Sequence, residues 1–548
     1  MKYFSLFAVI LLFSYIVKGQ TVGLIQHENN SLDDGYVLFA PNTSTTTYLI
    51  DKCGKKVKSW QSAYKPGQSV YLLSDGTLLR TGNTNNTTFK VGGSGGIVEK
   101  IDWDGNVVWS YIVSDATKCQ HHDVKAMPNG NVLIIAWESK TKTEAIAAGL
   151  NPSLAPTTVW SEYIIEVQPK GINGGTIVWE WHLWDHLVQD YDNNKPNFGA
   201  IASNHQLINI NYKSTTTNED WIHLNSIDYN PVLDQIVLSS HNFNEIWIID
   251  HSTSTAEAAS HTGGNSGAGG DLLYRWGNPA AYDKGTSATQ KLYGQHNAYW
   301  IPTGYPFEDQ IMIFNNGVRR PDGNYSTVEI INPPVNGYTY DISLPFLPSS
   351  TSWNYNYGDP NGLYSQNISG AQQLPNGNVL ICIGGSGSFI ETTTSGMQVW
   401  EYINPVKNTG VISQGTTPSM NSVFRCTYYP SSYTGFASHT LIPGKTIENS
   451  NTISDSCHLV LGIESNSDSN KLKIYPNPAK EKINISFIDI ESKNVSVQIF
   501  NTIGEIVYVT DEEVKGVLVI DIQSFETGMY VVKVDSERGS FSERFIKK

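Results

Sequence analysis

Short runs of alternating apolar and polar residues, separated by turn sequences, fill the chain between residues 22 and 440. A turn such as Pro-Asn-Gly leads into an apolar strand, a polar loop and further strands, and the last strand of the unit carries Trp. The turn-and-strand sequence PNGNVL occurs at 128–133 and 375–380, and SDGTLL at 74–79 is a third version. The closing strands with Trp include 106–111, 175–182 and 397–402. This alternation, bounded by Gly, Pro and Asn, predicts many β-strands and few helices.

The unit recurs six times, with a length of roughly 40–75 residues. A single four-stranded sheet cannot bury both faces, whereas sheets stacked around an axis can, with Trp and Leu filling the space between neighbours. The sequence therefore predicts an all-β protein whose main part is a six-bladed β-propeller. Two unrelated β-sandwiches are the alternative, and the repeated Pro-Asn-Gly and closing Trp favour the propeller. The best helix candidate is TKTEAIAAGL at 141–150, an insertion between two strands.

The two ends of the chain differ from the repeated part. Residues 1–20 contain Lys2 and an apolar run of 14 residues, Phe4–Val17, which is typical of a secretory signal peptide and short for the alternative, a membrane anchor. No later segment is apolar enough to span a bilayer, so we expect no transmembrane anchor. Ser, Asn and Asp dominate around 442–470, and short strands follow from there to the end. We expect a signal peptide at 1–20, a propeller at 21–441, a linker at 442–470 and a small β-sandwich at 471–548.

Charge and composition narrow the classes of partner. Lys and Arg total 36, Asp and Glu total 51, and the formal net charge is −15. An acidic chain without a basic block excludes nucleic acid and anionic membrane as main partners. The five cysteines show no metal-ligand spacing, so one or two disulfides are possible in an oxidising compartment.

Histidines at matched offsets are the main candidates for chemistry. His122, Asn225 and His296 each lie six residues before a proline that starts a turn, in three different units. His223 precedes Asn225 by two residues, and residues i and i+2 of a strand point the same way. If the units are blades, these side chains occupy equivalent places on inner strands, which converge on the propeller axis. We therefore predict that they meet in one pocket.

A set of His and Asn side chains fits the transfer of an anionic group. A neutral imidazole can act as a nucleophile, while protonated His and Asn donors stabilise negative charge on oxygen. The same residues could instead bind a divalent metal. The sequence GGSGG at 92–96 lacks the Lys and helix of a phosphate-binding loop, so we interpret it as a plain flexible loop. His182 and His186 have the spacing of metal ligands on a helix, but they follow a strand-ending Trp and fit loop packing better.

The C-terminal strands resemble a known secretion signal. YPNPAKEKINI at 475–485, VQIFNTIGEIV at 497–507, TGMYVVKV at 527–534 and the basic end FIKK are similar to the C-terminal sorting domain of the type IX secretion system. The resemblance implies an immunoglobulin-like β-sandwich that is read by the type IX secretion machinery. The protein would be exported through the periplasm of a Gram-negative bacterium and be secreted or held at the outer cell surface. A carbohydrate-binding β-sandwich is the alternative for this part.

Four motifs of the repeated part resemble the arylsulfotransferase family. They are HHDVKAMPNGNVL at 121–133, DWIHLNSIDYNP at 220–231, LSSHNFNEIWIID at 238–250 and GQHNAYWIP at 294–302. The family consists of six-bladed propellers that move a sulfuryl group from an aryl sulfate donor to a phenolic acceptor without a nucleotide. The resemblance implies a ping-pong reaction through a sulfo-histidine, with no cofactor and no metal, because the donor already carries the activated group.

The resemblance also assigns roles to the histidines. His296 would be the nucleophile that is transiently sulfurylated. His223 and Asn225 would hold the sulfate oxygens, and one of them would assist the aryl oxygen. His122 would be a further donor or general acid–base group, a part that the adjacent His121 could take instead.

One family position departs from the pattern. Where the family has Arg, this chain has His241, which is cationic only below its pKa, so anion binding needs another source of charge. Arg275 and Arg319 are the candidates to replace that Arg in space. Two alternatives to a sulfotransferase stay open: a non-catalytic secreted propeller that binds glycan or protein, and a metal-dependent lyase or hydrolase.

Overall fold

The computed structural model describes residues 20–28, 31–343, 345–356, 363–451, 472–487, 492–501, 506–514, 517–536 and 539–548. The chain divides into two compact units, Met1–His458 and Leu459–Lys548. Residues 1–19 of the predicted signal peptide and 452–470 of the predicted linker lie outside the described residues. The earlier part of that linker hydrogen-bonds to the first unit, where Gly444 N–H donates to Lys56 O at 2.9 Å.

Six antiparallel sheets of four or five strands dominate the described part of the first unit. The first three are β31 (Val423–Pro430), β2 (Gly35–Pro41), β3 (Thr46–Asp51), β4 (Lys56–Gln61); β5 (Pro66–Leu72), β6 (Leu78–Asn83), β7 (Gly96–Ile101), β8 (Val107–Ile112); and β9 (Lys118–Ala126), β10 (Val132–Thr141), β11 (Thr158–Lys170), β12 (Gly174–His182). The next three are β15 (Leu224–Asn230), β16 (Gln235–Ser240), β17 (Glu245–Asp250), β18 (Tyr274–Trp276); β19 (His296–Trp300), β20 (Ile311–Asn315), β21 (Thr327–Ile331), β24 (Trp353–Tyr355); and β25 (Gly370–Gln373), β26 (Val379–Ile383), β27 (Ser388–Thr392), β28 (Gln398–Ile403), β1 (Gly23–His27). Each repeat predicted from the sequence coincides with one of these sheets.

Short elements lie in the connections. They are the two-stranded ladders β13 (Leu187–Val188) with β14 (Ile208–Asn209), β22 (Val335–Asn336) with β23 (Thr339–Tyr340) and β29 (Val406–Lys407) with β30 (Gly410–Val411), and the helices α1 (Lys142–Ala147) and α2 (Thr255–Ala258). Helix α1 confirms the helix predicted at 141–150. Thr141 caps it, and the side chain of Glu144 returns to the Thr141 backbone to complete a capping box.

The sheets follow one another in cyclic order. The first strand of each sheet contacts the first strand of the next, from β31 through β5, β9, β15, β19 and β25 back to β31. Each sheet also carries on its fourth strand a Trp whose indole N–H donates to a backbone carbonyl in a strand or connecting loop of the next repeat. These bonds join Trp60 to Asp102 (3.0 Å), Trp109 to Gly174 (2.8 Å), Trp181 to Gly270 (2.7 Å), Trp276 to Pro348 (2.9 Å), Trp353 to Thr394 (3.3 Å) and Trp400 to Lys52 (2.7 Å). The repeated closing Trp thus gives each interface a satisfied donor, and five of these six rings are buried while Trp353 is partly exposed.

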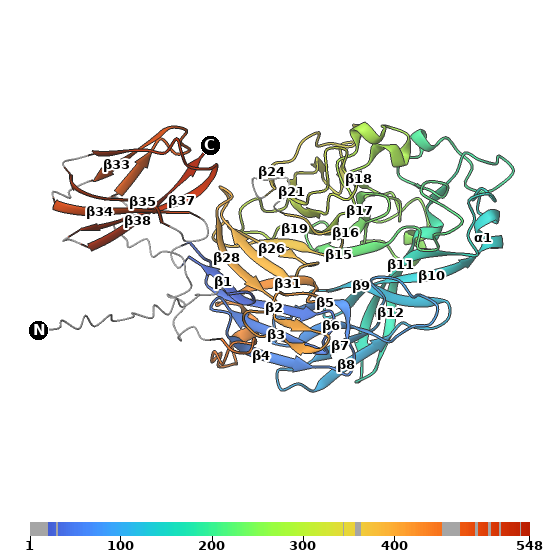
Figure 1. Cartoon of the computed structure of the whole chain (residues 1–548). Coiled ribbons are helices and arrows are strands. Elements are labelled where there is room, and N and C mark those ends of the chain that lie inside the picture. Colours follow the sequence, from blue (N-terminus) through green and yellow to red (C-terminus); the bar gives the residue numbers. More distant parts are fainter. Residues whose placement is uncertain are drawn as a thin grey trace, which may run out of the picture. The chain divides into compact units, whose positions relative to one another are not determined.

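Segments from opposite ends of the first unit share two sheets. Strand β31 pairs with β2, and strand β1 pairs with β28. Figure 1 shows β31 and β28 (orange) beside β2 and β1 (blue). This double closure was not predicted, because nothing local in residues 423–430 indicates that their partner lies almost 400 positions earlier.

The second unit is built from two sheets that share one core. One contains β32 (Leu472–Tyr475), β33 (Lys482–Phe487) and β36 (Val517–Asp521), and the other contains β35 (Ile506–Val514), β34 (Ser492–Phe500), β37 (Gly528–Ser536) and β38 (Gly539–Lys547). Ile485 of the first sheet and Val497, Val532 and Phe545 of the second belong to the same buried cluster. These sheets confirm strands throughout this part, and the immunoglobulin-like topology stays a prediction.

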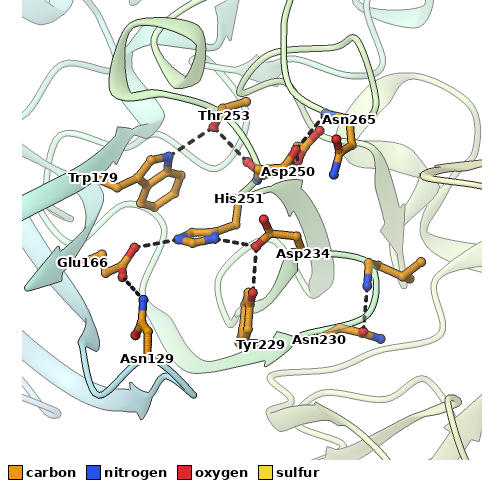
Figure 2. A network of polar contacts seen from close by, with 12 residues as sticks. Asn129, Glu166, Trp179, Tyr229, Asn230, Asp234, Asp250, His251, Thr253 and Asn265 are labelled. Atoms are coloured by element: carbon orange, nitrogen blue, oxygen red, sulfur yellow. Dashed lines mark hydrogen bonds and ion pairs between the residues drawn. The ribbon is translucent and has the colours of Figure 1, made fainter.

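A histidine between two carboxylates joins the third sheet to the fourth (Figure 2). His251 Nδ1 lies 2.7 Å from Asp234 Oδ1, and His251 Nε2 lies 3.0 Å from Glu166 Oε2. Burial opposes protonation of His251, but the hydrogen bonds and charges of Asp234 and Glu166 outweigh it and raise its pKa to about 9. Burial also opposes ionisation of Glu166, yet its bonds to His251, Asn131 and Asn129 lower its pKa to about 2. An imidazolium therefore bridges two sheets at neutral pH.

We expect this bridge to make stability depend on pH. A pKa raised from 6.5 to about 9 corresponds to about 3 kcal/mol of stability, present below pH 6.5 and lost as pH rises through about 9. Urea unfolding of wild type and His251→Gln should therefore differ most near pH 6 and converge toward pH 10. A difference that grows with pH would contradict the assignment.

Candidate active site

Five histidines predicted from the sequence form one cluster where neighbouring sheets meet. His121 and His122 lie on β9, His223 directly precedes β15, His241 follows β16, and His296 begins β19. Ring centroids are 5.2 Å apart for His121–His122, 4.5 Å for His122–His223, 5.2 Å for His223–His241 and 5.4 Å for His241–His296. The structure therefore brings together side chains that are up to 175 positions apart in sequence.

The backbone is unusual at or beside several of these histidines. His122 has φ +50°, His223 has φ +58° and Asn297 has φ +54°, all in the left-handed region. The pairing register of β9, β15 and β19 shifts beside these residues. Non-glycine residues in this region cost energy and concentrate at functional sites. Here the irregular backbone turns successive histidines out of the regular strand alternation.

The protonation of His296 is fixed by its neighbours. Asn316 Nδ2 donates to Ser365 O at 2.8 Å and to Ile368 O at 3.0 Å, so Asn316 Oδ1 must be the atom that lies 2.7 Å from His296 Nδ1. His296 Nδ1 therefore carries the proton. His296 Nε2 in turn accepts the Ile368 N–H at 3.2 Å, which requires a lone pair there. Burial, with further contributions led by the neighbouring His241, holds the pKa of His296 well below its usual value.

His223 differs from the other histidines of the cluster in its charge. Its Nδ1 is hydrogen-bonded to Asp220 Oδ2. Burial opposes protonation, but the Asp220 charge and hydrogen bond outweigh it and raise the pKa of His223 above 6.5. Burial lowers the pKa values of His121 and His122 well below 6.5. The cluster therefore contains one ring whose protonated form is stabilised, beside rings whose neutral form is favoured.

This charge predicts how pH affects the binding of an anionic substrate. As pH rises through the raised pKa of His223, the imidazolium loses its proton and kcat/KM should fall. In Asp220→Asn, burial is no longer opposed by a carboxylate, so this alkaline limb should move to lower pH. A pH profile of kcat/KM for both proteins tests this, and an unmoved limb would contradict the role of Asp220.

His241 does not restore the charge of the missing Arg. Its Nδ1 lies 2.9 Å from Asn242 Oδ1, and burial lowers its pKa to about 4, so the ring is neutral near pH 7. Arg275 is committed elsewhere, because it is fully buried and paired with Glu245. Arg319 lines a cleft of about 540 Å³ together with His241 and Lys213. Of the two arginine candidates, only Arg319 faces the same cleft as His241.

Asn225 is buried beside the cluster but directs its donor elsewhere. Its Nδ2 donates to Gln295 O at 2.7 Å, and its Oδ1 has no hydrogen-bond partner among the described residues. The expectation that it shares one face with His223 assumed regular strand alternation. The left-handed His223 and the register shift between Leu224 and Ser226 break that alternation.

Several residues that complete the cluster were missed from the sequence. The Oε2 atom of Glu162, on β11, lies 2.7 Å from His121 Nε2. Gly93 has φ +90°, and a Cβ there would lie 1.8 Å from His122 Cε1. The GGSGG loop therefore packs against His122, and Gly93 O also accepts the His122 N–H at 2.9 Å. Asp220 had a local signal, since it lies three residues before His223, whereas Glu162 and Asn316 had none.

Comparison with known protein families identifies the family of this chain. The sequence model of the arylsulfotransferase family matches residues 21–427. The chain belongs to the arylsulfotransferase family. A second match, the secretion system C-terminal sorting domain, covers residues 473–548. This member of the family is therefore sorted by type IX secretion to the cell surface or beyond, and no helix in its described part has the length and hydrophobicity that crossing a bilayer takes.

Solved structures resemble this arylsulfotransferase only distantly. A protein of unknown function from Bacteroides caccae is 11% identical, with 72% of this chain and 98% of that chain covered and a TM-score of 0.38. Virginiamycin B lyase from Staphylococcus aureus is also 11% identical, with 70% and 89% covered and a TM-score of 0.32. No curated protein matches the sequence.

A buried arginine lies beside the histidine cluster of this arylsulfotransferase. Arg425 Nη1 donates to Tyr71 Oη at 2.7 Å and to Asp123 Oδ2 at 3.1 Å. Its Nε and Nη2 have no partner among the described residues, and it lines a cavity of about 210 Å³. The positive charge of Arg425 contributes to the low pKa of His296, after burial and the nearer histidines.

His182 and His186, which have the sequence spacing of metal ligands, are hydrogen-bonded to different carboxylates. His182 Nδ1 lies 3.2 Å from Glu138 Oε1, while His186 Nδ1 lies 2.8 Å from Asp271 Oδ1. Among the described residues, the group with metal-ligand spacing is His186, His261 and Asp271. Hydrogen bonds between these three side chains already account for their approach.

Proposed function

We propose that this protein transfers a sulfuryl group from an aryl sulfate to a phenol by a ping-pong reaction through sulfo-His296. The observation that carries the proposal is the fixed tautomer of His296. Asn316 holds the proton on Nδ1, so a neutral ring presents a lone pair at Nε2. A neutral imidazole with a defined lone pair is what a histidine nucleophile requires.

In the first half-reaction, His296 Nε2 attacks the sulfur of the donor. The N–S bond forms while the S–O bond to the aryl oxygen breaks, and the aryl oxygen leaves with a proton. In the second half-reaction, a phenol oxygen attacks the same sulfur, its proton departs, and His296 Nε2 regains its lone pair. The donor displaces the Ile368 N–H from Nε2.

The charge for binding the sulfate comes from a different residue than in the family pattern. The His223 imidazolium, held by Asp220, lies between the rings of His122 and His241. Lys213 and Arg319 add positive charge in the cleft that reaches His241. Because the cluster is largely closed to water, each of these charges acts more strongly on a sulfuryl oxygen than it would in bulk solvent.

We also propose the domain organisation that positions this site and directs the export of the protein. The six sheets, their cyclic contacts and the Trp bonds between them support a six-bladed β-propeller. In it, residues 21–441 form the catalytic domain, 442–470 the linker and 471–548 an immunoglobulin-like sorting domain, after removal of a signal peptide at 1–20.

A two-stage assay tests the reaction. Purified protein is mixed with a chromogenic aryl sulfate, first without an acceptor and then with a phenol. We expect one equivalent of aryl alcohol to be released at once, followed by turnover only when the phenol is added. Peptide mass spectrometry of the first stage should find one sulfuryl group on the peptide that contains His296. Release without any protein-bound sulfuryl group would contradict the ping-pong step.

A further inference from the structure

A chain of three buried side chains leads away from the reaction centre. Glu162 Oε2 lies 2.7 Å from His121 Nε2, and His121 Nδ1 lies 2.9 Å from His122 Nδ1. All three residues are at most 3% exposed. The His121 ring stacks on Trp137 at 3.9 Å, which fixes its plane and both contacts. At the other end, the His122 ring lies 4.5 Å from that of His223, inside the cluster.

Two arrangements of protons keep both histidines neutral and satisfy both hydrogen bonds of this chain. With Glu162 ionised, His121 Nε2–H donates to it, His122 Nδ1–H donates to His121 Nδ1, and His122 Nε2 is a lone pair. With one proton more, Glu162 is protonated, both inner bonds reverse, and His122 Nε2 carries a hydrogen. Glu162 itself cannot turn away, because its Oε1 accepts the Leu224 N–H at 2.8 Å.

We propose that Glu162, His121 and His122 form a proton relay that stores on Glu162 the proton released by the phenol. This inference rests on the proposed sulfuryl transfer. In the second half-reaction the phenol proton moves to His122 Nε2, the Nδ1 proton of His122 moves to His121 Nδ1, and the Nε2 proton of His121 moves to Glu162 Oε2. The first half-reaction reverses these three transfers and protonates the leaving aryl oxygen. His122 is then the acid–base group, and Glu162 and His121 are positioning residues.

The environment of the relay explains where the proton is stored. Burial raises the pKa of Glu162 well above its usual value and lowers the pKa values of His121 and His122. A second imidazolium at His122 would also face cationic His223 at a ring distance of 4.5 Å. The other ionisable groups around the relay are Asp220, His241 and His296. Moving the proton to Glu162 leaves every relay group neutral.

The test variant is Glu162→Gln. Leu224 N–H should hold the amide oxygen of the new side chain, so its NH₂ group would face His121 Nε2. That donor forces His121 Nδ1–H toward His122 and leaves His122 Nε2 protonated, with no group that can store a further proton. With a weakly acidic phenol as acceptor, we expect desulfurylation to slow by roughly 10²–10⁴-fold.

Phenols of different acidity distinguish a loss of proton transfer from a structural defect of the variant. A nitrophenol that is already ionised brings no proton, and a nitrophenyl leaving group needs none. The variant should therefore keep its initial burst with nitrophenyl sulfate and its transfer to a nitrophenolate acceptor. Equal losses with weakly and strongly acidic phenols, or no loss with either, would overturn the relay. Absence of the sulfuryl adduct in wild type would instead refute the proposed function.

Two controls complete the experiment. Glu166→Gln changes a carboxylate four residues along the same strand that also holds a histidine, His251, and its kinetics should match wild type with every phenol. Should Glu162→Gln not fold, a proton inventory of wild type in mixtures of H₂O and D₂O decides the question. Three protons in motion predict a curved dependence with a weakly acidic phenol, and a linear dependence would overturn the relay.

Discussion

His296→Ala is expected to lower sulfuryl transfer by about 10³-fold or more, because it removes the atom that forms the N–S bond. The initial burst of aryl alcohol and the sulfuryl adduct should both disappear. The melting temperature should also fall, since the ring is buried and its hydrogen bonds to Asn316 and to the backbone of Gly294 and Ile368 are lost. Burst amplitude and peptide mass spectrometry measure the two effects separately.

The matched control for this variant is His261→Ala. His261 is 59% exposed and is hydrogen-bonded to Asp271 rather than to the cluster. It should retain the wild-type burst. Undiminished release of aryl alcohol by His296→Ala would refute His296 as the nucleophile, whatever His261→Ala does.

Much of the fold could be predicted because it repeats. The turn, the alternating strands and the closing Trp recur in each unit, so their positions on sheets and at interfaces follow from local pattern. The meeting of His122, His223 and His296 followed from the same repetition, since equal offsets in equivalent units give equivalent places in space. Residues 423–430 escaped prediction as the partner strand of β2, because pairing between distant segments leaves no local pattern.

The protonation states of the clustered histidines could not be predicted from their spacing in the sequence. His223 and His241 are both histidines in family motifs, yet the pKa of His223 is raised and that of His241 is lowered to about 4. The difference comes from Asp220, whose carboxylate faces His223, against Asn242, whose amide oxygen faces His241. Such contacts depend on the placement of side chains within the folded cluster, which the order of residues does not reveal.

For the proposed reaction, these contacts explain where the positive charge comes from that the family's Arg would otherwise supply. A buried cation is stable only beside a counter-charge, and Asp220 supplies it within the same motif as His223. Neutral His122 and His296 can then serve as acid–base group and nucleophile without repelling a second charge. The arrangement makes anion binding depend on pH, which an Arg would not.

Gly93→Ala is expected to lower kcat/KM by about 10²-fold by displacing His122. A Cβ at this position would overlap the His122 ring, at 1.8 Å from Cε1 and 2.2 Å from Nε2, and the φ of +90° is strained for any other residue. The ring must move, and a displacement of about 1 Å in a catalytic group costs this much in rate. Steady-state kinetics with a weakly acidic phenol measures the loss.

The neighbouring glycine provides the control that isolates the cause. Gly92 has no atom within 4 Å of its would-be Cβ and no left-handed φ, so Gly92→Ala should keep wild-type activity and melting temperature. In the double variant Gly93→Ala with His122→Gly, the clash is gone but the strain of the left-handed φ remains, so the melting temperature should recover in part while activity stays low. If neither the melting temperature nor the activity recovers, the defect lies in the backbone of the loop. Full activity in Gly93→Ala would show that transfer tolerates a displaced His122, and it would remove that ring from the reaction.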